Sequence, residues 1–184
     1  MNADKTALLL VDVINPLDFP EGPDLLEHAL PAARQIAKLK ARAAAAEVPV
    51  IYANDNFGRW RSDLRAVVQR CLAPDCLGRP LVEMLKPDPE DYFILKPMHS
   101  GFYCTALDAL LGSLRIRRVV LCGFAGDICV LFTANDAYMR GLQLVVPTDT
   151  CASNTTSDNE WALRHMKKTM KAEISDSESV TWKD

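Results

Sequence analysis

Short apolar runs alternate along the chain with longer amphipathic stretches. The runs are rich in Val, Ile and Leu, which is typical of strands buried on both faces of a parallel sheet. We expect five such strands, at residues 7–11, 48–53, 92–95, 118–122 and 142–146. Because parallel strands need crossover connections, the alternation predicts right-handed strand–helix–strand units.

Helix signals mark the stretches between these strands. The Ala-rich segment 31–47 begins with Pro31, which suits the first turn of a helix because its missing N–H is not needed there. Thr105 and Ser157 are each followed three residues later by an acidic residue, as in a capping box. Each therefore predicts the start of a helix, and the apolar residues that follow recur at helical spacing.

The fold class follows from this alternation. We expect a three-layer α/β/α domain with an open, Rossmann-like parallel sheet, and one domain over residues 1–184. Residues 59–89 are expected to form an excursion on the rim of the sheet. Either Ile174 or Val180 is expected to add a last edge strand.

Composition and charge exclude several classes. The chain is 49% hydrophobic and 24% charged with a formal net charge of −3, so it does not carry the basic surface that nucleic acids require. The basic cluster at residues 164–171 is interpreted as the solvated face of a helix. Asp12 cuts the first apolar run, which is therefore too short for a signal peptide or a membrane span. We expect a cytoplasmic protein that binds neither membrane nor nucleic acid.

Cysteine usage does not indicate a disulfide scaffold. Six cysteines in 184 residues are too sparse, and several lie in apolar runs, where reduced cysteine packs as a small hydrophobe. Cys71 and Cys76 could form a redox or metal-binding pair. No second Cys or His pair follows at zinc spacing, so packing or surface thiols are the favoured interpretation.

Three reactive side chains follow apolar runs. Asp12 follows the first run, Lys96 follows the run at 92–95, and Cys129 lies just beyond the run at 118–122. Ligands of such sheets bind outside the carboxyl ends of the strands, which is where all three are expected. Each alone is explained by a turn, a solvated charge or core packing. Together they are typical of a nucleophile with its activating groups.

The chemistry depends on activation of the thiol. A free thiol has a pKa of about 8.5, and a helix N-terminus or a neighbouring cation favours the thiolate. Asp127 is a plausible N-cap, which would put Cys129 in the first turn of a helix. Lys96 would supply the cation and also keep Asp12 in its charged, proton-accepting form.

The reactive residues lie in three motifs. These are LLLVDVIN around Asp12, YFILKPMHSGFYCTALDALL around Lys96 and LCGFAGDICV around Cys129. With these motifs in this order, the chain resembles, over nearly its whole length, the isochorismatase-like cysteine hydrolases. That family includes nicotinamidases and carbamoyl-amide amidohydrolases.

The resemblance implies a role for each matching position. Asp12 would be the general base, Lys96 the activating cation and Cys129 the nucleophile. The backbone N–H groups of Ala125 and Cys129 would form the oxyanion hole, and the Phe124-Ala125 peptide would be cis. The resemblance also implies a homo-oligomer.

The chain departs from the family pattern at informative positions. Metal-dependent nicotinamidases carry Asp-x-His after the second strand, but here Asp55-Asn56 is followed by Phe57. The three histidines are scattered, so we expect no metal and no cofactor, and nicotinamide is disfavoured as the substrate. Ile14 replaces the usual Gln of the first motif. Isochorismatases proper lack the cysteine, so Cys129 also disfavours vinyl-ether hydrolysis.

Candidate substrate contacts surround the three reactive residues, and packing roles remain an equal alternative for each. They are Phe19, Asn54, Phe57, Trp60, His99 and Tyr103. The sequence therefore predicts a cysteine hydrolase that cleaves a C–N bond of a small amide or carbamoyl substrate through a thioester. The alternatives are a hydrolase of another acyl substrate or a non-catalytic interaction domain. Nucleotide binding is disfavoured because GFAGDI lacks the glycine spacing of a dinucleotide loop.

Overall fold

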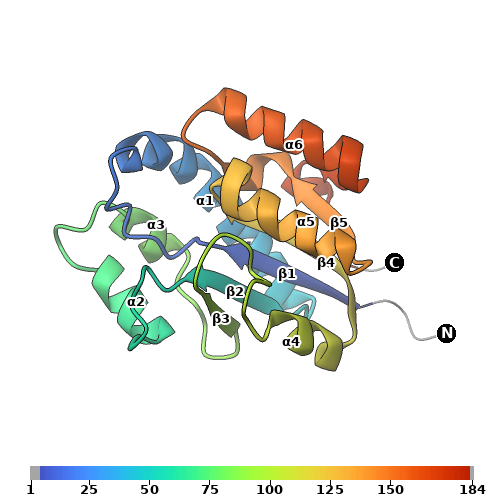
Figure 1. Cartoon of the computed structure of the whole chain (residues 1–184), viewed down its shortest axis with the longest axis horizontal. Coiled ribbons are helices and arrows are strands. Elements are labelled where there is room, and N and C mark those ends of the chain that lie inside the picture. The colour runs from blue at the N-terminus through green and yellow to red at the C-terminus, as the bar shows by residue number, and fades with distance from the viewer. Residues whose placement is uncertain (1–4, 183–184) are drawn as a thin grey trace.

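A parallel sheet forms the centre of the computed structural model, which describes residues 5–182 (Figure 1). The strands are β1 (Lys5–Val11), β2 (Val50–Asp55), β3 (Tyr92–Lys96), β4 (Ile116–Phe124), β5 (Gln143–Pro147), β6 (Cys151–Ala152) and β7 (Glu173–Ser175). Their order is β3-β2-β1-β4-β5-β7, and β6 pairs with β4. All of these pairings are parallel, which confirms the predicted fold class.

Helices cover both faces of the sheet (Figure 1). They are α1 (Gly22–Ala45), α2 (Leu64–Cys71), α3 (Arg79–Met84), α4 (Leu107–Leu114), α5 (Leu131–Met139) and α6 (Thr156–Met170). Helices α1, α2 and α3 pack on one face, and α4, α5 and α6 pack on the other. Shorter turns are the π-helical η1 (Gly126–Val130) and the 3-10 turns η2 (Thr148–Thr150) and η3 (Ser177–Ser179).

The central strand explains why the apolar runs are continuous. Leu8 and Leu10 of β1 belong to the core under α1, whereas Ala7, Leu9 and Val11 belong to the core under α5 and α6. Side chains of a strand alternate between the two faces of a sheet, and here both faces are buried. A run without polar interruptions is the result, and Asp12 is the first polar side chain after it.

The first helix is longer than the sequence predicts. It begins at Gly22, with Pro23 in its first turn, and Pro31 lies inside it. Pro31 removes one main-chain hydrogen bond, but it lies on the exposed side of α1, while the other side packs on the sheet. Packing of the apolar residues on the buried side keeps α1 continuous across Pro31. The proline by itself indicates a helix start, so the residue type alone does not predict this continuity.

Two helix starts differ from the predicted capping boxes. Thr155, not Ser157, caps α6, because its side chain accepts from the N–H of Asp158. Helix α4 starts after Ala106, which has no side-chain cap, and Thr105 accepts from the N–H of Leu107 at 3.2 Å. Both helices were predicted, so the errors are in the capping residues.

The segment predicted as a rim excursion contains two helices. Side chains of α2 and α3 are buried in the same core as α1, among them Val67, Cys71 and Leu81. The buried Cys71 therefore packs in the core, and Cys76 donates a weak hydrogen bond to the carbonyl of Pro16 at 3.5 Å. All six cysteines are free.

The last edge strand and the basic face of α6 agree with the sequence. Ile174 lies in the edge strand β7, whereas Val180 does not.

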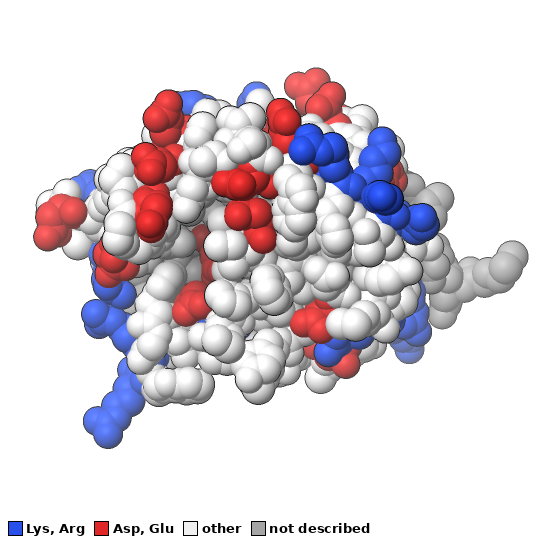
Figure 2. All heavy atoms as spheres, turned by 45° about the horizontal axis from the view of Figure 1, so that its top comes forward, with Lys and Arg blue, Asp and Glu red and all other residues white. Residues whose placement is uncertain are grey.

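The basic residues of α6 are exposed, as expected of a solvated helix face. Figure 2 shows both acidic and basic side chains on one face of the molecule. Within residues 5–182, none of the helices is both long and apolar enough to cross a membrane. The homo-oligomer and the cytoplasmic location stay predictions.

Gly123 allows β4 to lie close to β1 beside Asp12. Its φ is +132°, and a Cβ there would lie 2.0 Å from the carbonyl oxygen of Val11. We expect Gly123→Ala to lower the free energy of unfolding by more than about 3 kcal/mol, because backbone atoms must move. Gly112→Ala is the matched control, since a Cβ on Gly112 in α4 meets nothing within 4 Å.

The measurement is urea denaturation of both variants. Alanine is the better helix former, so Gly112→Ala should raise the free energy of unfolding by about 0.5–1 kcal/mol. Equal stability of the two variants would contradict the close approach of the strands.

Candidate active site

Three reactive side chains meet at the carboxyl ends of the strands. Asp12 directly follows β1, Lys96 is the last residue of β3, and Cys129 lies in η1 beyond β4. Strand β2 separates β1 from β3, so the long side chain of Lys96 reaches across its end. Its Nζ lies 2.7 Å from Oδ2 of Asp12 and 3.7 Å from Sγ of Cys129. The structure thus brings together the three residues that the sequence singled out.

A fourth residue, Asp55, completes this cluster. It ends β2 in register with Lys96, and its Oδ2 lies 3.5 Å from Nζ of Lys96. Its backbone N–H donates to Oδ1 of Asp12 at 2.6 Å. In the sequence, Asp55 is notable only for the missing histidine of the metal motif, because Asn54 separates it from the apolar run that ends at residue 53. The ammonium group therefore lies between two carboxylates.

Burial sets the protonation of the ion pair. The side chains of Lys96 and Asp12 are only 0% and 5% exposed. Burial raises the pKa of Asp12, and the positive charge of Lys96 opposes this. Burial acts to lower the pKa of Lys96, but Asp12, Cys129 and Asp55 outweigh it and hold that pKa above its ordinary value. Lys96 is therefore charged, and Asp12 has a raised affinity for a proton.

Neighbouring groups act on the thiol of Cys129 in opposite directions. Burial raises its pKa, Asp12 raises it further, and Lys96 only partly opposes them. The thiol therefore lies beside a carboxyl group, Asp12, that can accept its proton. Cys129 is half-buried, whereas Asp12 and Lys96 are buried, so the sulfur is the most accessible of the three reactive groups.

The turn that carries Cys129 also differs from the predicted helix start. The π-helical turn η1 begins at Gly126 after Ala125, so Asp127 already lies inside the first turn and is not the N-cap. The backbone N–H of Asp127 donates to Oγ of Ser153 at 3.1 Å. The peptide bond between Phe124 and Ala125 is cis.

The carbonyl of Ala125 is the acceptor at the start of this turn. The N–H groups of Ile128 and Val130 both donate to it, at 3.2 and 3.1 Å. Within the described chain, no protein acceptor contacts the N–H of Ala125. The oxyanion hole formed by the N–H groups of Ala125 and Cys129 stays a prediction.

Thr133 links the two segments that carry Lys96 and Cys129. Its Oγ1 donates to the carbonyl of Cys129 at 2.7 Å and accepts from the N–H of Gly101, in the loop after β3, at 2.9 Å. Thr133 is fully buried. This side chain therefore holds η1 and the loop after Lys96 in a fixed relation.

Asn54 has a different role from the predicted substrate contact. It is fully buried, and its amide accepts from the N–H of Ile14 at 3.2 Å and donates to the carbonyl of Ile14 at 2.6 Å. Both polar atoms thus bond the backbone of the loop that follows Asp12. Asn54 holds this loop in place, which corrects the expectation that its amide binds substrate.

The remaining candidate contacts lie mostly at the surface. Trp60, Tyr103 and Phe19 are 79%, 50% and 36% exposed. Phe57 lines a cavity of about 170 Å³ beside α2. The ring of His99 lies 5.2 Å from that of Phe132 in α5, the helix that follows η1. Their contact with substrate stays a prediction.

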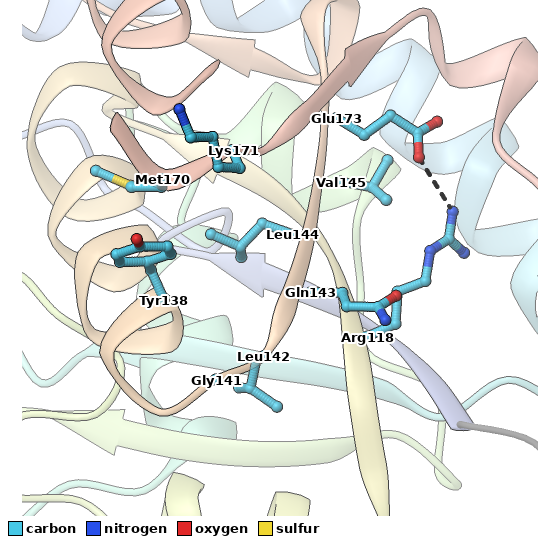
Figure 3. Close-up of a pocket in the computed structure, with 10 residues that line it drawn as sticks. All are labelled: Arg118, Tyr138, Gly141, Leu142, Gln143, Leu144, Val145, Met170, Lys171 and Glu173. Carbon is cyan, nitrogen blue, oxygen red and sulfur yellow. Dashed lines mark ion pairs between the residues drawn. The ribbon is translucent and has the colours of Figure 1, made fainter. Parts of the chain in front are cut away.

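A larger cavity lies away from the reactive cluster. It has a volume of about 420 Å³ and is bounded by the ends of α5 and α6 and the starts of β5 and β7 (Figure 3). Its lining includes the ion pair of Arg118 and Glu173 at 3.8 Å, but no cysteine. In residues 5–182, no group of three or more His, Cys, Asp or Glu side chains is arranged to hold a metal ion.

The fold and the site define the class of protein. An open parallel sheet between helices, with a thiol, a carboxylate and an ammonium group at the carboxyl ends of its strands, is the architecture of an α/β/α hydrolase. Residues 6–179 match the isochorismatase domain family. The chain belongs to this family, and it is an isochorismatase-like hydrolase.

Sequence relatives extend over most of the chain. The isochorismatase family protein YaaI of Bacillus subtilis, described as uncharacterized, is 43% identical over 178 residues, which are 97% of each chain. A ureidoacrylate amidohydrolase, RutB of Methylorubrum extorquens, is 31% identical over 192 residues and covers 90% of this chain and 77% of its own length.

Solved structures are similar over almost the whole chain. The N-carbamoylsarcosine amidase of Thermoplasma acidophilum has a TM-score of 0.73 and 27% identity, covering 96% of this chain and 98% of its own. The nicotinamidase of Staphylococcus aureus has a TM-score of 0.70 and 27% identity, covering 94% and 99%.

Proposed function

We propose that this protein is a cysteine hydrolase that cleaves the C–N bond of a small amide or carbamoyl substrate through a thioester. The observation that carries the proposal is the position of one ammonium group, Nζ of Lys96, 2.7 Å from the carboxylate of Asp12 and 3.7 Å from the sulfur of Cys129. The substrate class is supported by relatives named ureidoacrylate amidohydrolase, N-carbamoylsarcosine amidase and nicotinamidase.

Acylation begins with the resting thiol. Asp12 accepts the proton of Cys129 as the sulfur attacks the carbonyl carbon, and Lys96 compensates the negative charge that forms on sulfur. The carbonyl oxygen becomes an oxyanion and accepts from the N–H groups of Ala125 and Cys129. The raised pKa of Asp12 supports this role, because a more basic carboxylate accepts the proton of a thiol more readily.

Asp12 passes the proton of Cys129 to the departing nitrogen and later returns a proton from water to the sulfur. The tetrahedral intermediate collapses, the C–N bond breaks, and protonated Asp12 gives its proton to the departing nitrogen. A water molecule then attacks the thioester carbonyl while Asp12 accepts one of its protons. The carbon–sulfur bond breaks, and the sulfur recovers its proton from Asp12.

The experiment is a panel of small primary amides and N-carbamoyl compounds with ammonia detection. Release of ammonia from at least one compound at a rate proportional to enzyme concentration supports the proposal. Turnover of esters alone would assign another acyl substrate, and no turnover of amides or esters would favour the non-catalytic interaction domain.

The pH dependence of kcat/KM tests Asp12 as the base. Asp12 must be ionised to accept a proton, so activity is lost as the pH falls through its pKa, which burial raises. We expect kcat/KM to fall about tenfold per pH unit on an acidic limb that lies above the value of about 3.9 for a free aspartate. The raised pKa of Lys96 predicts no alkaline loss below about pH 10.

The profile is measured from pH 4 to 10 at constant ionic strength. Circular dichroism at each pH is the control, because it separates loss of activity from acid unfolding. A level profile down to pH 4 would contradict a base with a raised pKa.

A further inference from the structure

The proposed mechanism leaves the second carboxylate of the site without a role. Asp12 already supplies the base, and Lys96 already has a close counter-ion in Asp12 at 2.7 Å. Asp55 adds another negative charge to the same ammonium group at 3.5 Å. A second carboxylate near a nucleophilic thiol opposes thiolate formation, since Asp55 also raises the pKa of Cys129. Formation of the thiolate therefore does not explain Asp55.

One oxygen of Asp55 has unused capacity. Oδ1 accepts from the N–H of Phe57 at 2.6 Å, whereas Oδ2 has only the longer contact with Lys96. The side chain of Asp55 is 23% exposed, compared with 5% for Asp12 and 0% for Lys96. Asp55 is thus the more exposed of the two carboxylates of the cluster, and its Oδ2 is the oxygen with the free capacity.

The chemistry of this oxygen selects its partner. An ionised carboxylate only accepts hydrogen bonds, so its partner must carry an N–H or O–H donor. Two carboxyl groups and one ammonium group surround this position, which disfavours an anionic partner. A primary amide or a carbamoyl group supplies N–H donors next to its carbonyl without a negative charge. An ester of the same size offers no donor.

We infer that Asp55 is a specificity-determining residue whose Oδ2 accepts an N–H of the substrate nitrogen next to the carbonyl carbon that Cys129 attacks. This inference rests on the proposed function and narrows its substrates to primary amides and carbamoyl groups. The proposed acceptor and the nucleophile lie near one another, because Nζ of Lys96 contacts both Oδ2 of Asp55 and Sγ of Cys129.

Alkylation of Cys129 tests the inference without a known substrate. Iodoacetamide carries a primary amide, and methyl iodoacetate replaces it with an ester while remaining neutral. The rates at Cys129 are measured for both reagents by peptide mass spectrometry on the full chain, and the exposed Cys104 is the internal reference. The ratio of the two rates is the readout, because a change in the pKa of Cys129 alters both rates together.

We expect the ratio of the iodoacetamide rate to the methyl iodoacetate rate to be higher at Cys129 than at Cys104. Asp55→Asn should lower the ratio at Cys129 about tenfold, as expected for loss of a hydrogen bond to a charged group. The asparagine oxygen can still accept from the N–H of Phe57, and Asp55→Ser is a second variant that retains an acceptor. Asp127→Asn is the matched control, since it removes a carboxylate two residues from Cys129 that makes no ion pair in the described chain.

The outcomes separate the inference from the proposed function. A ratio unchanged in Asp55→Asn and Asp55→Ser overturns the inference, and so does an equal fall in Asp127→Asn, which would show a general effect of charge. Because alkylation needs no turnover, these results do not depend on the amide panel. A protein that hydrolyses amides but keeps its ratio in both Asp55 variants would retain the proposed function and lose the inference.

Discussion

Cys129→Ala is expected to lower the rate of amide hydrolysis by at least about a thousandfold, because the variant removes the nucleophile. The fold should stay intact. The side chain of Cys129 is half-buried, so its loss leaves little cavity. Ammonia release measures the activity, and thermal unfolding measures the stability. Cys104→Ala is the matched control, since Cys104 is an exposed thiol in the loop after β3.

The thioester gives a second readout of the same prediction. Acid quenching of the wild-type protein during turnover should leave an acyl group on the peptide that contains Cys129, detectable by its mass. The Cys104→Ala variant should retain both the activity and the adduct. Comparable ammonia release by Cys129→Ala and the wild type would remove the cysteine mechanism, whatever the substrate.

Lys96→Met is expected to abolish activity and to lower the free energy of unfolding by about 3–5 kcal/mol. Methionine is unbranched and only one heavy atom shorter than lysine, but it leaves the buried carboxyl group of Asp12 without its counter-ion. Urea denaturation measures the loss of stability. Lys38→Met on the exposed side of α1 is the control, and it should change the free energy of unfolding by less than about 0.5 kcal/mol.

A double variant separates the structural role of Lys96 from its chemical role. Asp12→Asn combined with Lys96→Met removes both buried charges, so part of the stability lost in Lys96→Met should return. The activity should not return, because the general base is also gone. Further destabilisation by Asp12→Asn in the Lys96→Met background would show that the ion pair is not the source of the loss.

The candidate site could be found from the sequence because of the geometry of parallel sheets. Strands in such a sheet end at one edge, so residues that follow different apolar runs meet there even when they are distant in the chain. Asp12 and Lys96 both follow this rule. Asp55 also lies at this edge, but in the sequence it indicates only an incomplete metal motif, and its contact with Lys96 depends on β2 lying between β1 and β3.

Other features were not predictable because they depend on packing. Pro31 is tolerated inside α1 because the opposite side of the helix is buried against the sheet. Asn54 is committed to the backbone of Ile14, a partner forty residues away in sequence. Neither fact follows from local residue types, because each depends on which segments the fold brings together.

The sequence by itself determined the parallel sheet, the helices between its strands and the edge at which Asp12, Lys96 and Cys129 gather, because hydrophobic period and strand ends are local properties of the chain. Only the tertiary structure decided that burial and Asp12 raise the pKa of Cys129 and that Lys96 is shared with Asp55. The physical reason is that desolvation and Coulomb interactions depend on burial and on distances of a few ångströms, which residue order alone does not specify.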